Sequence, residues 1–315
     1  MANQPHRIIF MGTPEFAVPS LRALLDGPDQ VVAVVTQPDR PRGRGRKLTP
    51  PPVKTLALEA GVPVLQPASV RTAEFLNELK SYGPDIIAVT AFGRILPGAL
   101  LDLPPLGTIN VHASLLPRYR GAAPIQWAIL NGDHTTGVTI MQLDEGLDTG
   151  DILLSQSLAI APDDTAATLA VRMAEMGGSL LCEALVKLHQ GKLPPTPQNE
   201  AQATAAPPLT KEQGLVDWNL PAGVLSCRVR GLDPWPTAFT LLNGLRLRLY
   251  APSVLVGEGS ATPGTIIRAD QEGLVIATGR DCLLVKEIQM EGGKRLALQA
   301  FLRGHELAAG TILGR

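Results

Sequence analysis

The chain has 315 residues, of which 45% are hydrophobic and 18% charged, a composition that excludes a disordered polypeptide and allows two domains with substantial cores. Its formal net charge of -1 excludes a polycation, so any contact with nucleic acid has to come from a local basic patch. The cysteines, Cys182, Cys227 and Cys282, lie far apart in the sequence and indicate neither a disulfide framework nor a metal-binding knuckle.

The N-terminal sequence has no charged region followed by a long apolar run, and no segment approaches membrane-spanning length. We therefore expect a cytoplasmic protein with reduced thiols and no membrane partner. A monomer is expected, because the sequence has no long apolar segment that would form an interface with a protein partner.

Residues 7–36 predict a βαβ unit. A short apolar strand at 7–11 is followed by Gly12, by apolar residues at helical spacing and by a second strand at 31–36, which together predict a parallel sheet. Only one glycine stands in the turn, so the dinucleotide fingerprint is absent. This argues against a nicotinamide-dependent oxidoreductase.

A basic stretch follows at residues 37–52, with five cationic side chains within eight residues, spaced by Gly and Pro. This composition predicts a mobile, exposed loop without regular structure. The stretch is either a solvated linker or a phosphate-binding segment. Because like charges crowd here in an otherwise neutral protein, the second interpretation is favoured.

Helices are predicted at 53–60 and 73–81, and the nearly continuous apolar run at 85–90 predicts a parallel strand buried on both faces. That strand leads into residues 91–97, at the carboxyl edge where open α/β sheets bind ligands. Residues 91–97 are either part of a ligand site or an ordinary strand-to-helix loop.

The central stretch, residues 107–126, places polar Asn110 and His112 two residues apart at the end of an apolar strand. Alternation along a strand puts both side chains on one face. An imidazole moves protons near neutral pH, and an amide can donate a hydrogen bond to an oxyanion, so this pair can act on a carbonyl group. Taken alone, His112 would be a core histidine, but the Arg- and Pro-rich loop that follows and the Gly-flanked Asp148 favour catalysis.

These residues carry a family resemblance. Asn110-Val-His112, Ser114-Leu-Leu-Pro117 and the distal Asp148 resemble the signature of the 10-formyltetrahydrofolate-dependent formyltransferases. Within that group, residues 7–16, 36–41 and 118–126 resemble the methionyl-tRNA formyltransferase family. The resemblance covers nearly the whole chain and is strongest up to about residue 151.

The resemblance implies transfer of a formyl group from 10-formyltetrahydrofolate to methionyl initiator tRNA, for the initiation of protein synthesis, without a metal. Asn110, His112 and Asp148 would be catalytic. The residues implied for binding the folate donor are Phe92, Ile95, Leu96, Ser114, Leu115, Leu116 and Pro117. The residues implied for binding tRNA are Arg42, Arg44, Arg46, Lys47, Arg118 and Arg120.

After a helix predicted from Thr165 to about Gln190, a Pro- and Ala-rich stretch at 193–208 indicates a linker. Short strand-like runs with Gly turns then predict a small β-barrel. The expected fold is therefore α/β, with a Rossmann-like, mostly parallel formyltransferase domain at 1–192. The linker leads to a C-terminal barrel at 209–315, which by resemblance is an oligonucleotide-binding (OB-like) fold that contacts tRNA.

Other interpretations stay open. The same catalytic trio occurs in formyltransferases that act on glycinamide ribonucleotide or on nucleotide-linked amino sugars, and in a formyltetrahydrofolate hydrolase. Only the basic stretch and the C-terminal barrel argue for tRNA. An RNA-binding protein without catalysis is disfavoured because Asn110, His112 and Asp148 are all present.

Overall fold

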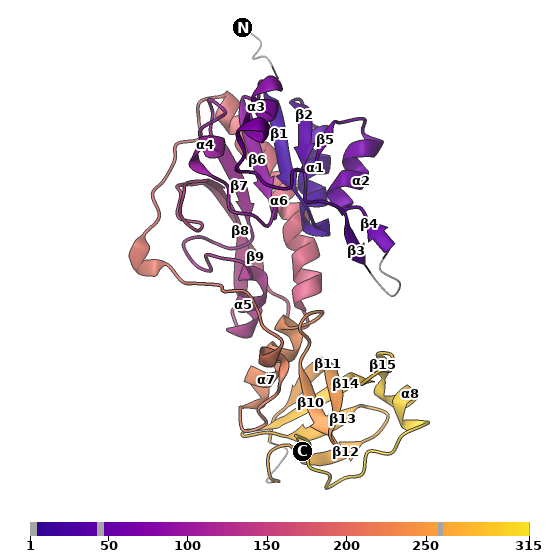
Figure 1. Cartoon of the computed structure of the whole chain (residues 1–315). Coiled ribbons are helices and arrows are strands. Elements are labelled where there is room, and N and C mark those ends of the chain that lie inside the picture. The colour runs from indigo at the N-terminus through magenta and orange to yellow at the C-terminus, as the bar shows by residue number, and fades with distance from the viewer. Residues whose placement is uncertain (1–4, 43–46, 258–260, 315) are drawn as a thin grey trace. The chain divides into compact units, whose positions relative to one another are not determined.

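A computed structural model describes residues 5–42, 47–257 and 261–314 of the chain (Figure 1). The chain divides into two compact units. Unit 1 consists of Met1–Gly121, Thr136–Ala159 and Ala170–Ala206, and unit 2 of Ala122–Thr135, Ile160–Leu169 and Pro207–Arg315. Each unit has its own sheet and hydrophobic core.

Unit 1 is built on a seven-stranded sheet. In their order across the sheet, the strands are β5 (Val64–Leu65), β2 (Gln30–Val35), β1 (Arg7–Gly12), β6 (Ile86–Thr90), β7 (Thr108–His112), β8 (Thr135–Gln142) and β9 (Ile152–Ala159). The first five run parallel to their neighbours, and β8 is antiparallel to β7. The predicted mostly parallel sheet is confirmed.

The helices of unit 1 cover both faces of this sheet (Figure 1). They are η1 (Glu15–Ala17), α1 (Val18–Leu25), α2 (Pro52–Glu59), α3 (Ala73–Ser81), α4 (Gly98–Leu101) and α6 (Ala166–His189), whose first residues, up to Leu169, are assigned to unit 2. All five residues of β6 are buried, as its apolar run predicts. Ile9 and Ile87 share a core cluster with Phe75 and Leu79 of α3.

Two glycines let α6 approach its neighbours closely. A Cβ at Gly177 would lie 2.8 Å from the Cγ1 of Val111 in β7, and one at Gly178 would lie 2.8 Å from the carbonyl oxygen of Pro19 in α1. Since real Cβ atoms almost never come so near, a side chain at either position would push α6 away from β7 or α1. The helix is thereby held against the strand that carries Asn110 and His112.

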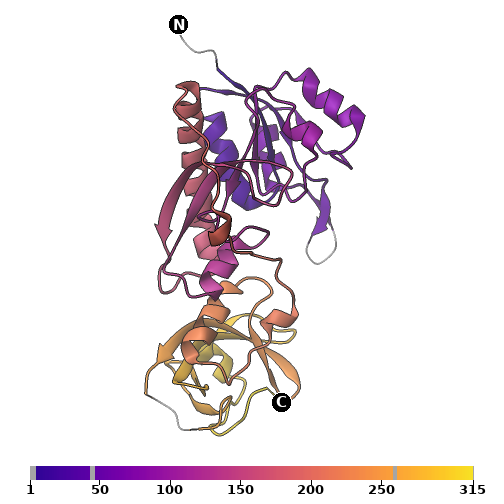
Figure 2. The ribbon, with the colours of Figure 1, turned by 90° about the vertical axis from the view of Figure 1, so that its left-hand side faces the viewer.

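The basic stretch has regular structure, contrary to the sequence prediction. β3 (Arg40–Arg42) and β4 (Lys47–Thr49) form a separate antiparallel pair, with Arg40 opposite Thr49 and Pro41 opposite Leu48. The hairpin lies outside the main sheet, at one side of unit 1 (Figure 2). Composition argued against a core here, but two short strands can pair through their backbones without one.

Unit 2 contains a six-stranded antiparallel sheet. Its strands are β10 (Phe239–Leu242), β11 (Leu245–Leu255), β14 (Cys282–Met290), β13 (Leu274–Ala277) and β12 (Ile266–Ala269), with β15 (Leu296–Ala297) paired to β14. Its helices are α5 (Pro124–Leu130), η3 (Glu212–Gly214), α7 (Ala222–Gly231) and α8 (Leu298–Leu302). The predicted fold class, a mostly parallel domain followed by a barrel-like antiparallel one, is confirmed.

The predicted linker, residues 193–208, is largely part of unit 1. Up to Ala206 it clusters with that unit, and it contains the short helix η2 (Glu200–Gln202). Thr196 exchanges two backbone hydrogen bonds of 2.8 Å with Ile152 at the start of β9. The proposed domain limits at 192 and 209 stay a prediction. Over the described residues, we find no helix with the length and apolarity that crossing a membrane requires.

Two histidines and an aspartate join the N-terminal strand to the end of α6. Asp29 Oδ1 accepts a 2.8 Å hydrogen bond from the backbone N–H of His6 and lies 2.8 Å from His189 Nε2. The rings of His6 and His189 stack with centroids 3.6 Å apart. Burial and, second, the neighbouring His189 lower the pKa of His6, although Asp29 acts in the opposite direction.

We expect stability to decrease as the pH falls below about 6.5. The folded-state pKa of His6 lies below its ordinary value of 6.5, so the unfolded chain binds more protons in this range and the free energy of unfolding falls. Urea titrations between pH 7.5 and 5.5 measure this dependence. His6→Phe, which keeps a ring against His189, should flatten it, whereas the exposed control His134→Gln should not. An equally steep dependence in His6→Phe would contradict this account.

Candidate active site

Strand β7 delivers Asn110 and His112 to the same face of the sheet, as the sequence predicts. The strand lies between β6 and β8, so its backbone is fixed by hydrogen bonding on both sides. Asn110 is half-buried, and His112 is 5% exposed. Among the described residues we find no hydrogen bond to the side-chain amide of Asn110.

The loop after β7 is folded by two buried hydroxyl groups. Ser114 Oγ donates a 2.6 Å hydrogen bond to the carbonyl of Arg118. Thr139 Oγ1, from β8, donates to the carbonyl of Ser114 (2.7 Å) and accepts from the N–H of Leu116 (3.2 Å). These bonds turn the chain back over the end of β7. The side chain of Ser114 thus shapes the loop, and a contact from its hydroxyl to folate stays a prediction.

The orientation of His112 is set by the same loop. Its Nε2 lies 3.0 Å from the carbonyl oxygen of Tyr119. A carbonyl can only accept a hydrogen bond, so Nε2 carries a proton and donates. Nδ1 is therefore the nitrogen that can exchange a proton, and it faces Asp148 Oδ2 at 3.7 Å.

Asp148 comes from the loop between β8 and β9 and is held by the opposite loop. Its Oδ2 accepts a 2.8 Å hydrogen bond from the N–H of Gly121, and its side chain is only 14% exposed. Gly121 has φ = 123°, and a Cβ there would lie 2.7 Å from the carbonyl oxygen of Ala206. Glycine is therefore required at the position that donates to Asp148.

The residues predicted to bind folate differ in exposure. Phe92 and Leu96 are buried in the core of unit 1, Ile95 is 71% exposed, and Leu116 is buried between half-buried Leu115 and Pro117. The carbonyl of Phe92 accepts hydrogen bonds from Thr13 Oγ1 (3.1 Å) and Gln37 Nε2 (2.9 Å), which fix the 91–97 loop. Of the three residues predicted in this loop, only Ile95 has a side chain largely open to solvent; their folate contacts stay predictions.

The residues predicted to bind tRNA fall into three groups. Lys47 in β4 and Arg118 are exposed. Arg44 and Arg46 lie outside the described residues, as does the side chain of Arg42. Arg120 is already bound within unit 1, since its guanidinium donates to Gln198 Oε1 and to both carboxylate oxygens of Glu200.

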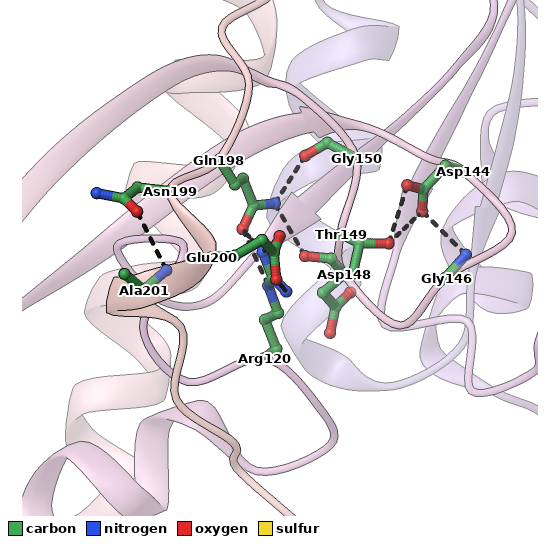
Figure 3. Close-up of polar contacts among 10 residues, drawn as sticks. All are labelled: Arg120, Asp144, Gly146, Asp148, Thr149, Gly150, Gln198, Asn199, Glu200 and Ala201. Carbon is green, nitrogen blue, oxygen red and sulfur yellow. Dashed lines mark hydrogen bonds and ion pairs between the residues drawn. The ribbon is translucent and has the colours of Figure 1, made fainter.

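Sequence reasoning missed the residues that support the site from a distance, which are Gly121, Thr139, Gln198, Glu200 and Thr204. The last three lie in the segment predicted to be a linker, and Figure 3 shows Gln198 beside Arg120 and Asp148. Thr204 Oγ1 accepts from the N–H of Tyr119 (2.8 Å), the residue whose carbonyl orients His112. A Pro-rich composition carries no signal for such contacts.

Comparison with known proteins places the chain in a family. The formyl transferase family model matches residues 6–185, and the model of its C-terminal domain matches residues 208–306. The chain is 60% identical over 307 residues to a methionyl-tRNA formyltransferase of Desulfotalea psychrophila, covering 98% of this chain and 95% of the relative. It is 51% identical over 308 residues to one of Geobacter sulfurreducens, covering 98% and 96%.

The chain belongs to the methionyl-tRNA formyltransferase family. Two solved structures share its fold. An N-formyltransferase from Helicobacter canadensis, in complex with folinic acid and dTDP-3-aminofucose, matches 92% of this chain and all of its own with a TM-score of 0.67 and 19% identity. HypX from Aquifex aeolicus, in complex with tetrahydrofolic acid, matches 97% of this chain and 50% of its own with a TM-score of 0.63 and 20% identity.

We expect Thr139→Val to destabilise the protein and to lower its activity. The change leaves the N–H of Leu116 and the carbonyl of Ser114 buried without a partner, at a cost of about 1–3 kcal/mol for such a group. The matched control is Thr136→Val in the same strand, because the buried Thr136 hydroxyl has no hydrogen-bond partner among the described residues. Chemical denaturation and formyl-transfer assays of both variants measure the difference; equal stability would contradict this account of the loop.

Proposed function

We propose that this chain transfers the formyl group of 10-formyltetrahydrofolate to the amino group of methionyl initiator tRNA, with Asn110, His112 and Asp148 as its catalytic residues. The observation that carries the proposal is the arrangement at the end of β7. Asn110 and His112 share one face, His112 Nε2 is held by a carbonyl, and Nδ1 lies 3.7 Å from a carboxylate.

Asn110 would donate a hydrogen bond to the formyl oxygen as the amine attacks the formyl carbon and the oxygen becomes an oxyanion. One donor of this kind contributes about 3 kcal/mol in other enzymes. Collapse of the tetrahedral intermediate breaks the bond from the formyl carbon to N10 of the folate. The amine loses one proton and N10 gains one, so the reaction needs no net acid or base.

His112 would either stabilise the oxyanion as an imidazolium or carry the proton, and both roles use Nδ1, because Nε2 is held by Tyr119. Asp148 would orient the imidazole, offset its positive charge and, through water, accept the proton that the amine loses. A 3.7 Å separation is longer than a hydrogen bond, so Asp148 would act on a protonated imidazole through its charge.

The folate donor and the tRNA are proposed to bind to different segments around this site. The turn at 114–117 and the 91–97 loop would flank the folate donor, with Ile95 as the exposed apolar contact. The hairpin of β3 and β4, with Arg42, Arg44, Arg46 and Lys47, would bind tRNA phosphates together with Arg118. Arg120 could join them only by giving up its present partners. Action as a monomer in the cytoplasm, away from membranes, completes the proposal.

Removing any one of the catalytic groups should reduce turnover by roughly 100-fold or more. Asn110→Ala, His112→Ala and Asp148→Asn test the three residues in a formyl-transfer assay with saturating substrates. Glu145→Gln is the matched control, because it removes an exposed carboxylate from the same loop as Asp148. If all three catalytic variants kept near wild-type turnover, the mechanism would be wrong.

Neutralising the hairpin should weaken tRNA binding and leave folate binding unchanged. Changing Arg42, Arg44, Arg46 and Lys47 to Gln should raise KM for methionyl-tRNA, more at low salt than at high salt, because ion pairs with phosphates are screened. A control with the same loss of charge changes the exposed Arg22, Arg71, Lys80 and Lys192.

The acceptor of the formyl group distinguishes this proposal from the other formyltransferases and from a formyltetrahydrofolate hydrolase. Methionyl initiator tRNA should be formylated, whereas free methionine, glycinamide ribonucleotide, nucleotide-linked amino sugars and water should not accept the formyl group. Efficient transfer to a small amine or to water, independent of the hairpin, would keep the catalytic trio and remove tRNA from the proposal.

A further inference from the structure

Gln198 connects the two loops that form the candidate active site (Figure 3). Its Nε2 donates to the carbonyl of Asp148 (2.9 Å) and to the carbonyl of Gly150 (2.7 Å). Its Oε1 accepts from Nε (3.0 Å) and Nη2 (2.9 Å) of Arg120. Both N–H groups and both lone pairs of the amide are therefore used, and only one orientation of the amide satisfies all four bonds.

Asp148 has a backbone conformation that needs such support. Its φ is 55°, in the left-handed region, which costs a non-glycine residue of the order of 1–3 kcal/mol and persists only where surrounding contacts enforce it. Gly121 fixes the carboxylate through one hydrogen bond. Gln198 fixes the backbone on both sides of Thr149, through the carbonyls of Asp148 and Gly150.

Arg120 anchors the other end of the amide. It follows Tyr119 directly, and its backbone is bound to the segment that contains Gln198: its N–H donates to the carbonyl of Thr204 (2.8 Å), and its carbonyl accepts from the N–H of Ala206 (2.7 Å). Glu200 accepts two further hydrogen bonds from the guanidinium, and this pairing lowers the pKa of its carboxyl group and raises the pKa of Arg120. Arg120 is thus held by its backbone, through Thr204 and Ala206, and by its guanidinium, through Gln198 and Glu200.

We infer that Gln198 is a positioning residue for formyl transfer, which holds Asp148 at its distance from His112 by joining the Asp148 loop to Arg120. This inference rests on the proposed function. The inference is based on the contacts of the Gln198 side-chain amide, which bonds both to the loop that orients His112 and to the loop that carries Asp148. A displacement of about 1 Å in a catalytic group can cost as much as 100-fold in rate.

Only glutamine fits these four contacts. A glutamate would keep the pairing with Arg120 through one oxygen but would turn its other oxygen toward the carbonyls of Asp148 and Gly150, where acceptor would meet acceptor. A methionine has a similar length and makes none of the four bonds. Gln198→Glu and Gln198→Met therefore remove the donor function with little change in volume.

We expect both variants to lower kcat by roughly 10- to 100-fold, while KM for the folate donor changes less than about threefold, because Gln198 contacts none of the side chains proposed to bind folate. Gln202→Met, which makes the same change at an exposed glutamine of the same segment, should stay within about threefold of wild type in kcat. A loss of folding would lower the concentration of active enzyme in proportion to the unfolded fraction, which circular dichroism and active-site titration measure.

A double-mutant cycle with Asp148→Asn decides whether Gln198 acts through Asp148. Gln198→Met should lower kcat by 10- to 100-fold in the wild-type background and by less than about threefold when Asp148→Asn is already present. Equal losses in both backgrounds, or a rise in KM with unchanged kcat, would overturn the inference and leave the catalytic trio in place. If Asp148→Asn alone kept full activity, the proposed catalytic role of Asp148 would fail, and with it the basis of this inference.

Discussion

The candidate site depends on one interaction, the hydrogen bond from His112 Nε2 to the carbonyl of Tyr119. It decides which imidazole nitrogen is free, and so which groups can exchange a proton. Because Nε2 is held, Nδ1 is the nitrogen that can exchange a proton, and it faces Asp148. A buried imidazole oriented in this way fixes its tautomer before a substrate arrives.

The rest of unit 1 keeps this arrangement in place. The sheet fixes β7, and Thr139 and Ser114 turn the next loop back until the Tyr119 carbonyl meets the imidazole. The segment at 196–206 then binds the outer side of that loop, through Thr204 and Ala206. Catalytic sites need rigid support in general, because reacting groups have to stay within a fraction of an ångström of their productive positions.

Much of the fold could be predicted from the sequence because its signals are local. The apolar run of β6 predicted a buried parallel strand, and the alternation at Asn110 and His112 predicted their common face. The pairing of β3 with β4 was not predicted, because backbone hydrogen bonds between short strands leave no hydrophobic pattern. Helix α7 was also missed, in a region that the sequence predicted to consist of short strands.

The support of the site could not be predicted for a different reason. Gln198 lies 78 residues beyond Arg120 and 50 beyond Asp148, and its neighbours in the sequence are those of a flexible linker. Contacts at such separations depend on how the whole unit folds. The requirement for glycine at position 121 could not be predicted either, because it arises from the close approach of the Ala206 carbonyl in the folded protein.

The most direct test of this account is the tautomer of His112, read from nitrogen chemical shifts of protein labelled with 15N-histidine, with His112→Gln used to assign its signals. Because the Tyr119 carbonyl can only accept, we expect Nε2 to carry a proton throughout the pH range in which the protein is folded, and only Nδ1 to lose or gain one. An imidazole protonated at Nδ1 alone would contradict it, since Nε2 could then not donate to Tyr119 and Nδ1 could not accept a proton beside Asp148.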